Sequence, residues 1–279
     1  VREALTGVKP ESYESDLQSV VRPPTLCAGC PHRGFFQAIK KKKGLMINGD
    51  IGCYTLGANA PLSALDTAIC MGASLSMAHG AAQAYKVAGA KTKAVGVLGD
   101  STFFHSGITS LMDAVYNQSD SISVILDNRI TGMTGHQENP GTGFTLMGKP
   151  APEVDIPALV KAVGIKEENI YTVNPLHLDE VDKVLDACIA SEEPTVIITR
   201  WPCVLKKFSQ QDLDEFKGLH QTQCHIIQDK CRNCKACVRT GCPALMSSKD
   251  DVVIDVNSCV GCTVCKQVCP FDAIEEVQR

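Results

Sequence analysis

A repeated cysteine pattern near the carboxyl end constrains the fold of this chain more than any other feature. Three cysteines, each separated from the next by two residues, recur 28 positions later, and a Cys-Pro pair follows each triplet. The chain holds 15 cysteines in 279 residues, an odd number that excludes pairing of all of them in disulfides. The sequence begins with Val and shows no leader, so we expect a processed product or fragment whose thiols stay reduced and bind metal.

The spacing of these cysteines predicts two [4Fe-4S] clusters. Three thiolates of one tight loop bind three irons of a cubane, and the cysteine before proline in the other half binds the fourth. Zinc knuckles are the alternative, but two of them would use four cysteines rather than eight. One loop has four residues, not the usual three, between Cys237 and Cys242, which removes no ligand. We expect one cluster on Cys231, Cys234, Cys237 and Cys269, and the other on Cys242, Cys259, Cys262 and Cys265.

Short apolar runs alternate with helical patterns between residues 25 and 200. Continuous Val, Ile and Leu runs are typical of strands buried on both faces of a parallel sheet. We therefore predict an α/β fold, a mostly parallel sheet with helices on both faces, followed by a small α+β ferredoxin-like domain. The expected strands are 45–48, 94–98, 122–126 and 195–199, and a helix is expected at 178–189. The expected domains are a linker (1–24), the α/β domain (25–205), a polar connector (206–223) and the cluster domain (224–279).

Polar residues follow two of the expected strands. Asp100 comes after the strand 94–98, and Asn128 comes after the strand 122–126. Neighbouring parallel strands end at the same edge of a sheet, so we expect both side chains to meet there. Carboxylate and amide oxygens suit Mg2+, which commonly bridges a protein to phosphate. A diphosphate would lie against Gly99 and Ser101, a helix expected to start near Ser106, and the hydroxyls of Thr131 and Thr134.

A Gly-Asp pair or an Asp-Asn pair after a strand is a common turn by itself. The distance between the two pairs along the chain is more specific. Gly99-Asp100 followed 28 residues later by Asn128 resembles the diphosphate-binding motif of thiamine diphosphate enzymes. The resemblance implies that Asp100, Asn128 and the backbone carbonyl of Ile130 hold Mg2+. The match is incomplete, because Ser101 replaces a second glycine and Asp127 replaces a first Asn.

Four further cysteines flank expected elements outside the tail. Cys27 and Cys30 precede an expected helix, whereas Cys53 and Cys203 follow strands. A parallel sheet would gather them at the edge that carries Asp100, an arrangement that resembles the proximal [4Fe-4S] cluster of pyruvate:ferredoxin oxidoreductase. A zinc knuckle, a redox-active dithiol and a small buried hydrophobe stay open as alternatives. Three cysteines remain. We expect Cys70 and Cys188 in the core, and Cys224 has no assigned role.

Three segments are similar to the large subunit of indolepyruvate:ferredoxin oxidoreductase: 25–34, 49–54 and 99–107. The resemblance runs from residue 25 to the end. It implies oxidative decarboxylation of aryl 2-oxo acids such as indolepyruvate, with thiamine diphosphate, Mg2+, coenzyme A and external ferredoxin. It also implies amino-terminal domains or a separate chain that supplies the pyrimidine-binding domain with its activating glutamate, and a small partner subunit. This chain alone should therefore bind the cofactor weakly and not turn over.

Two histidines lie within the similar segments. His32 and His105 are candidates for acid–base or orienting roles, with a structural, hydrogen-bonded role as the alternative. Other functions also stay open: a pyruvate or branched-chain 2-oxoacid:ferredoxin oxidoreductase, a non-oxidative thiamine diphosphate decarboxylase, and an electron-carrier module.

The charge and hydropathy of the chain argue against two kinds of binding partner, nucleic acid and membrane. The net charge of -4 and a single short cationic run, Lys40–Lys43, which we expect to close a helix, argue against nucleic acid. The longest uncharged stretch, 67–85, is rich in Ala, Gly and Ser, which predicts a closely packed helix rather than a membrane span. We therefore expect a cytoplasmic protein.

Overall fold

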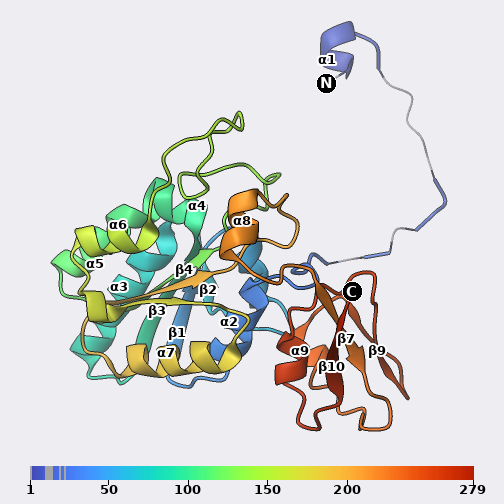
Figure 1. Cartoon of the computed structure of the whole chain (residues 1–279). Coiled ribbons are helices and arrows are strands. Elements are labelled where there is room, and N and C mark those ends of the chain that lie inside the picture. Colours follow the sequence, from blue (N-terminus) through green and yellow to red (C-terminus); the bar gives the residue numbers. More distant parts are fainter. Residues whose placement is uncertain (1, 10–14, 19, 22) are drawn as a thin grey trace.

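The computed structural model describes residues 2–9, 15–18, 20–21 and 23–279. From residue 23 onward the chain forms an α/β body with a smaller cysteine-rich domain beside it (Figure 1). A short helix, α1 (Arg2–Thr6), precedes them. Part of the linker expected at 1–24, namely residues 1, 10–14, 19 and 22, lies outside the described residues.

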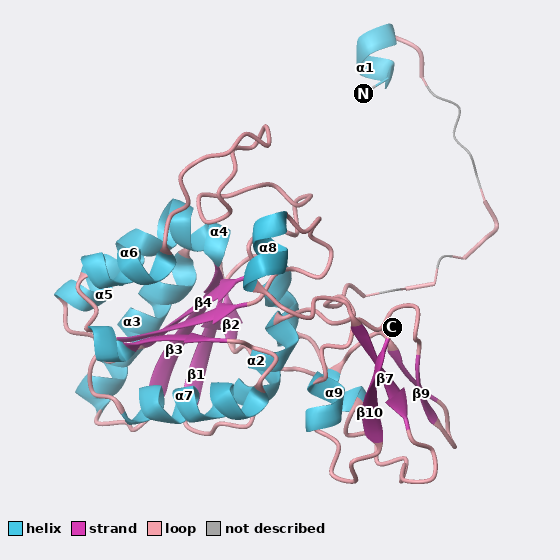
Figure 2. Ribbon diagram, in the orientation of Figure 1, coloured by secondary structure: helices cyan, strands magenta, loops and turns pink. Residues whose placement is uncertain are grey.

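A six-stranded sheet forms the centre of the body, and every hydrogen-bonded pair of its strands is parallel (Figure 2). The order is β2-β1-β3-β4-β6-β5, so the carboxyl ends of β3 and β4 are neighbours at the middle of the sheet. The four predicted strands are confirmed, and the two that were missed are short strands at the sheet edges. The strands are β1 (Leu45–Gly49), β2 (Thr67–Ala68), β3 (Lys93–Gly99), β4 (Ile122–Asp127), β5 (Ile170–Val173) and β6 (Thr195–Arg200).

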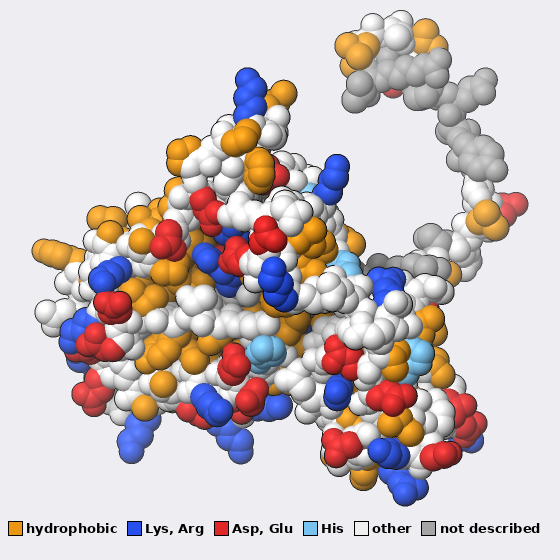
Figure 3. Space-filling view, viewed as in Figure 1, with side chains coloured by type: hydrophobic (Ala, Val, Ile, Leu, Met, Phe, Trp, Pro, Cys, Tyr) orange, Lys and Arg blue, Asp and Glu red, His pale blue; other side chains and the backbone are white. Residues whose placement is uncertain are grey.

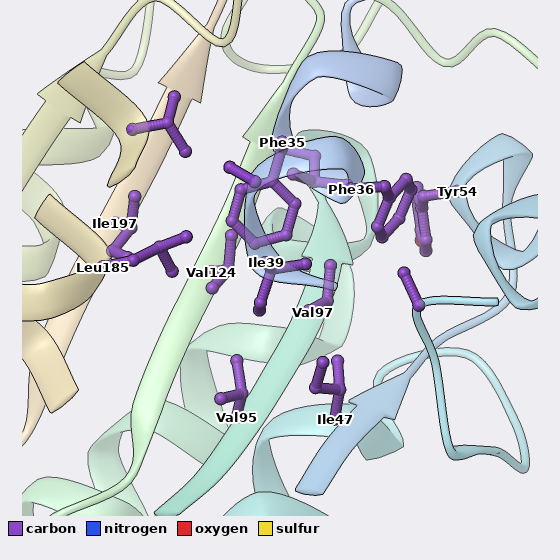
Figure 4. Packing of buried hydrophobic residues seen from close by; sticks show 14 of the residues in the cluster. Phe35, Phe36, Ile39, Ile47, Tyr54, Val95, Val97, Val124, Leu185 and Ile197 are labelled. Atoms are coloured by element: carbon purple, nitrogen blue, oxygen red, sulfur yellow. The ribbon is translucent and has the colours of Figure 1, made fainter. Parts of the chain in front are cut away.

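Helices cover both faces of this sheet, which confirms the predicted fold class. One face carries α2 (His32–Ile39) and α7 (Leu178–Ala190), and the other carries α3 (Ala73–Ala88), α5 (Ile108–Tyr116) and α6 (Ile156–Val163). Successive side chains of a strand point to opposite faces. Val97 therefore packs in the same core as Phe35 and Phe36 (Figure 4), whereas Leu98 packs in the core that contains Leu75. Burial on both faces explains why the strands read as continuous apolar runs.

Two helix starts differ from expectation. The helix expected near Ser106 begins at Asp100, because α4 (Asp100–Thr102), a π-helical turn (Phe103–Gly107) and α5 follow one another without a break. The helix expected at 67–85 begins only at Ala73, since residues 67–68 form the edge strand β2. Cys70 consequently lies before the helix and is exposed, so its expected core role is wrong, whereas Cys188 is buried as expected.

The segment expected as a connector packs on the body. It forms α8 (Gln210–Glu215), and Lys206 Nζ donates to both carboxylate oxygens of Asp212 at 2.6 Å in a buried pair. The ring of Phe216 packs edge-on against Trp201. The small domain is α+β, as predicted, with two antiparallel strand pairs and one short helix: β7 (Thr222–Ile226) with β10 (Ile274–Gln278), β8 (Leu245–Ser247) with β9 (Val252–Ile254), and α9 (Val264–Gln267).

The small domain is bound to the body by polar and apolar contacts. Gln267 accepts a hydrogen bond from the backbone N of Leu178 at 2.9 Å and donates one to the carbonyl of Leu176 at 2.7 Å. The two leucines share an apolar cluster with Val264 and Trp201. The cysteine sites of the two parts therefore have a fixed relative position.

On the face shown in Figure 3, acidic and basic side chains are interspersed over both parts of the molecule. Among the described residues, none of the helices combines the length and the apolar character that crossing a bilayer requires.

Candidate functional site

A cavity that opens to solvent lies where β3 and β4 end. Its wall contains every residue predicted to hold the diphosphate and its metal: Gly99, Asp100, Ser101, Asn128, Ile130, Thr131 and Thr134. The parallel topology brings the two loops together, as the pairing of Gly99 with Leu126 across β3 and β4 shows.

Asp100 is the first residue after β3 and is 3% exposed. Its Oδ2 accepts a hydrogen bond from Asn139 Nδ2 at 2.9 Å, and none of the ion pairs within the described part of the chain includes it. Burial has the largest effect on the pKa of Asp100, and the negative charge of Asp127 has the next largest. Together they raise this pKa to about 8. A buried carboxylate without a cationic partner fits a site for a divalent cation.

Asn128 stands opposite Asp100 at the end of β4 and is also buried. Its Oδ1 accepts from the backbone N of Ile130 at 3.4 Å, so residues 128–130 turn tightly at the cavity wall. Its Nδ2 lies 3.4 Å from His32 Nε2. Two of the three expected Mg2+ ligands thus come from one compact turn.

The two candidate histidines have different positions. His32 is buried in the cavity wall, and burial lowers its pKa to about 4, so its imidazole is neutral near pH 7 and can accept the hydrogen bond from Asn128. His105 is exposed, lies 2.9 Å from Ser106 Oγ through Nδ1, and is not part of the cavity wall. His105 lies in the π-helical turn Phe103–Gly107, and the role expected of it stays a prediction.

Tyr54 fills the space beside the loop that carries Asp100. Its hydroxyl donates to the carbonyl of Ile51 and lies 3.0 Å from Thr102 Oγ1. A Cβ on Gly99 would meet Tyr54 Cε1 at 2.6 Å. Glycine is therefore needed at position 99 to admit the Tyr54 ring, a reason that the sequence does not reveal.

A network of ion pairs supports the loop after β4. Asp127 accepts hydrogen bonds from Arg200 Nε at 2.8 Å and from the backbone N of Arg129 at 3.1 Å. Arg129 is buried, has a left-handed backbone with φ 60°, and pairs with Glu153 at 2.8 Å. Because Asp127 already has an ion-pair partner in Arg200, Asp100 is the carboxylate that remains for a metal ion.

The four cysteines that resemble a proximal cluster site, Cys27, Cys30, Cys53 and Cys203, converge beside this cavity. Burial is the largest cause that raises the pKa of Cys30 and of Cys53. The neighbouring thiols of Cys203 and Cys27 raise both pKa values further. Cys53 also lines the cavity. The backbone N of Cys203 donates to the carbonyl of Asn128 at 2.9 Å, which joins the thiol group to the expected Mg2+ loop.

The tail holds two further cavities. Each is lined by one of the two sets of four cysteines that were expected to bind a cluster. One small cavity is lined by Cys231, Cys234, Cys237 and Cys269. The other is lined by Cys242, Cys259, Cys262 and Cys265, together with Cys224. In both, the cysteine before proline joins the triplet of the other half, which is the pairing that the sequence predicts.

Both cysteine loops have left-handed residues at equivalent positions. Asn233 and Lys235 flank the central cysteine of the first loop with φ values of 49° and 58°. Their counterparts 28 positions later, Gly261 and Thr263, have φ values of 70° and 57°. Left-handed residues at both places curl each loop around its cavity, although this conformation costs a non-glycine residue about 1 kcal/mol.

The thiols of the cysteine sites are spread around their cavities. In the described part of the chain, no group of three or more His, Cys, Asp or Glu side chains is gathered closely enough to hold one metal ion. In a cubane each thiolate binds a different iron, so the sulfur atoms stand further apart than around one zinc ion. Cys224, unassigned from sequence, is buried and its backbone N donates to Cys259 Sγ at 3.3 Å.

Sequence reasoning missed several residues around the cavity. Tyr54 and Asn139 are distant in sequence from the motif, and Arg129 follows it directly. A bulky aromatic residue between Cys53 and Thr55 and an arginine directly after Asn128 were the available signals. Neither signal specifies a partner, because the partners come from other loops.

Comparison with known proteins agrees with this geometry. The family model described as thiamine pyrophosphate enzyme, C-terminal TPP binding domain, matches residues 50–199, and the 4Fe-4S binding domain matches residues 252–275. The chain is 39% identical to indolepyruvate oxidoreductase subunit IorA of Archaeoglobus fulgidus and to that of Thermococcus kodakarensis, over 96% of its own length. It spans only 42% and 43% of those relatives.

A solved structure shares the fold. It is a 2-oxoglutarate:ferredoxin oxidoreductase from Magnetococcus marinus with 2-oxoglutarate, coenzyme A and succinyl-CoA bound. The TM-score is 0.58 at 16% identity, covering 75% of this chain and 74% of that one. The resemblance found in the sequence is thus confirmed, and the chain belongs to the thiamine pyrophosphate enzymes through their C-terminal TPP-binding domain, followed here by a 4Fe-4S binding domain.

Proposed function

We propose that this chain is the thiamine diphosphate- and cluster-binding part of a 2-oxoacid:ferredoxin oxidoreductase that acts on aryl 2-oxo acids such as indolepyruvate. The overall reaction would convert the acid and coenzyme A to acyl-CoA and carbon dioxide, with the electrons passing to ferredoxin. Both domain matches and the IorA relatives support a 2-oxoacid oxidoreductase, and the aryl preference follows their name.

One observation carries the proposal: the cofactor cavity and the first cysteine site share a wall. Cys53 lines the cavity and also neighbours Cys27 and Cys203. The first cysteine site is also close to the nearest tail site. Gly29 lies between Cys27 and Cys30, and a Cβ on it would be 2.1 Å from Val260 Cγ2, in the loop between Cys259 and Cys262. Three adjacent cluster sites would form a path for electrons from the cofactor to the tail.

Each residue of the cavity has a proposed task. Asp100, Asn128 and the carbonyl of Ile130 would hold Mg2+, while Gly99, Ser101, Thr131 and Thr134 would contact the diphosphate. Thiamine diphosphate, when bound, supplies the carbanion-stabilising chemistry that 2-oxo acid decarboxylation requires. Neutral His32 would orient Asn128 rather than act as an acid, because its lowered pKa leaves the ring at pH 7 without the acidic proton of an imidazolium.

An apolar rim supports an aryl substrate. Ile51, Met71 and Met133 line the cavity and are 37%, 52% and 53% exposed. The aromatic side chain of the substrate would cover this rim, together with the pyrimidine-binding domain of another chain or chain segment.

The proposed partners of this chain are that pyrimidine-binding domain, a small subunit and external ferredoxin. A cytoplasmic, reducing setting is proposed as well, because thiols that bind iron must stay reduced.

The test is a substrate panel on the protein purified without oxygen together with its partner chains. Indolepyruvate, phenylpyruvate, pyruvate and a branched-chain 2-oxo acid are each supplied with coenzyme A, and ferredoxin reduction and acyl-CoA are measured. We expect about 12 iron atoms per chain, from three four-iron sites, and the highest kcat/KM with aryl acids. Highest kcat/KM with pyruvate or a branched-chain acid would refute the aryl assignment.

Two other functions would give different results in the same experiment. A non-oxidative decarboxylase would release aldehyde without reducing ferredoxin. An electron-carrier module would bind neither thiamine diphosphate nor Mg2+ with every partner present. The carboxylate at position 100, which is buried and without a cation, favours the catalytic function over the carrier.

A further inference from the structure

The side chain of Arg33 is 1% exposed at the contact between the body and the small domain. Its Nη1 donates to the carbonyl of Thr240 at 2.8 Å, and its Nη2 donates to the carbonyls of Leu26 and Cys27 at 2.7 and 3.0 Å. Its Nε is buried without a partner. All of its acceptors are neutral, and none of the ion pairs in the described part of the chain includes Arg33.

Within the residues that the structure describes, the other buried Arg and Lys side chains are paired. Arg129 contacts Glu153 at 2.8 Å, and Lys206 contacts Asp212 at 2.6 Å. A buried charge without a counter-charge costs several kcal/mol. Arg33 is therefore an exception that requires a negative partner other than an Asp or Glu side chain.

The surroundings of Arg33 identify that partner. One guanidinium nitrogen bonds the carbonyl of Cys27, in the first cysteine site, and the positive charge also lowers the pKa of the Cys30 thiol against the larger effect of burial. The same side chain lines the tail cavity that contains Cys242 and Cys259. Arg33 thus lies between two groups of thiols, each of which carries net negative charge once it binds iron.

The loop that meets Arg33 is the one with the additional residue. Between Cys237 and Cys242 the chain forms a 3-10 turn, Val238–Thr240, and then Gly241 with φ 72°. A Cβ on Gly241 would lie 3.2 Å from Arg33 Nη1. The four-residue loop therefore brings the Thr240 carbonyl to the guanidinium, and glycine leaves room for it.

We propose that Arg33 is the shared counter-charge of the proximal cluster and of the adjacent tail cluster, and that it raises the reduction potential of both. A [4Fe-4S] core of charge +2 with four thiolates has a net charge of -2, and one-electron reduction adds a further negative charge. A fixed positive charge in a buried setting stabilises the reduced form more than the oxidised form. Arg33 would thereby ease electron flow from the cofactor cavity into the tail, as a positioning charge and not as a catalytic residue.

This inference rests on the proposed function, because it needs iron at both cysteine sites. It competes with a purely structural role, in which the three hydrogen bonds only tie the two domains together. The two roles separate when charge and hydrogen bonding are changed independently. Arg33→Gln keeps an amide donor but removes the charge, whereas Arg33→Lys keeps the charge with fewer donors.

The control is Lys40→Gln. Lys40 Nζ contacts the carbonyl of Arg239 at 3.4 Å, next to the Thr240 carbonyl that Arg33 uses, but Lys40 is partly exposed. Solvent screens its charge, so removing it should leave the cluster potentials unchanged. The control therefore reports any general effect of weakening the domain contact.

The experiment is a redox titration followed by electron paramagnetic resonance, on anaerobically purified protein with its partner chains. We expect more negative midpoint potentials for two of the three clusters in Arg33→Gln, and potentials close to wild type in Arg33→Lys and Lys40→Gln. Loss of iron in Arg33→Gln but not in Arg33→Lys would equally support the counter-charge. Fully loaded Arg33→Gln with wild-type potentials, or equal iron loss in both Arg33 variants, would overturn it. Wild-type protein without iron at these sites would instead refute the proposed function.

Discussion

Asp100→Asn should stabilise the metal-free protein while abolishing the proposed cofactor site. The pKa of Asp100 rises from an ordinary 3.8 to about 8 in the folded state, through burial and the charge of Asp127. The folded state therefore binds the proton more tightly than the unfolded state, and stability falls as the pH rises from about 4 towards 8. Asn keeps the shape and can still accept the hydrogen bond from Asn139, but it carries no charge to bury.

The magnitude follows from the pKa difference. Roughly 3 pH units separate pH 7 from 3.8, and each unit corresponds to about 1.4 kcal/mol. At pH 7 the carboxyl at position 100 thus costs the metal-free protein about 4 kcal/mol, which the substitution should recover. For a domain of this size, that gain raises Tm by about 10 °C. Near pH 4 the gain should shrink to less than about 1 kcal/mol, because the carboxyl is protonated in the folded state and close to half protonated in the unfolded state.

The assay is thermal unfolding in a chelating buffer at pH 4, 5.5 and 7, with equilibrium dialysis against Mg2+ and thiamine diphosphate on the complete protein. Asp179→Asn, which removes a 74% exposed carboxylate, is the matched control and should change stability by less than about 0.5 kcal/mol. The reasoning is refuted if Asp100→Asn unfolds at or below the wild-type temperature at pH 7, or if it still binds the cofactor with wild-type affinity.

Three further predictions concern the surroundings of the site. Gly99→Ala places a Cβ 2.6 Å from the buried Tyr54 ring and should destabilise the protein by about 1–3 kcal/mol in urea unfolding. Cys203→Ser should lower the iron content from about 12 to about 8 atoms per chain, measured on anaerobic protein, because one of three sites loses a ligand. Glu153→Gln leaves the buried Arg129 without its 2.8 Å partner and should cost about 1–2 kcal/mol, since Glu153 is itself 29% exposed.

Each of these has a control with the same chemistry. A Cβ on Gly80 meets nothing within 4 Å, so Gly80→Ala in α3 should slightly stabilise the protein, and a loss as large as that of Gly99→Ala would contradict the steric argument. Cys70→Ser should keep all the iron, since Cys70 is exposed and lines none of the three cysteine sites. Glu193→Gln breaks an exposed pair with Lys166, and an effect equal to that of Glu153→Gln would show that burial is irrelevant.

The sequence determined those features that depend on short stretches of chain. Apolar runs located the four central strands, because strands buried on both faces need no long-range information to be recognised. Cysteine spacing assigned the two tail sites, and the order of strand and polar turn located Asp100 and Asn128. The edge strands β2 and β5 were missed because they are short, and β5 is only partly buried.

Only the tertiary structure decided which residues act on one another across these elements. The sequence could not show that Asp127 is paired with Arg200, that Gly99 must admit Tyr54, or that His105 faces solvent. It also could not show that Arg33 is buried between two cysteine sites, because Thr240 lies 207 positions away. Local spacing specifies ligands that share a loop, whereas burial and charge balance arise from packing between distant segments, which a single sequence does not display.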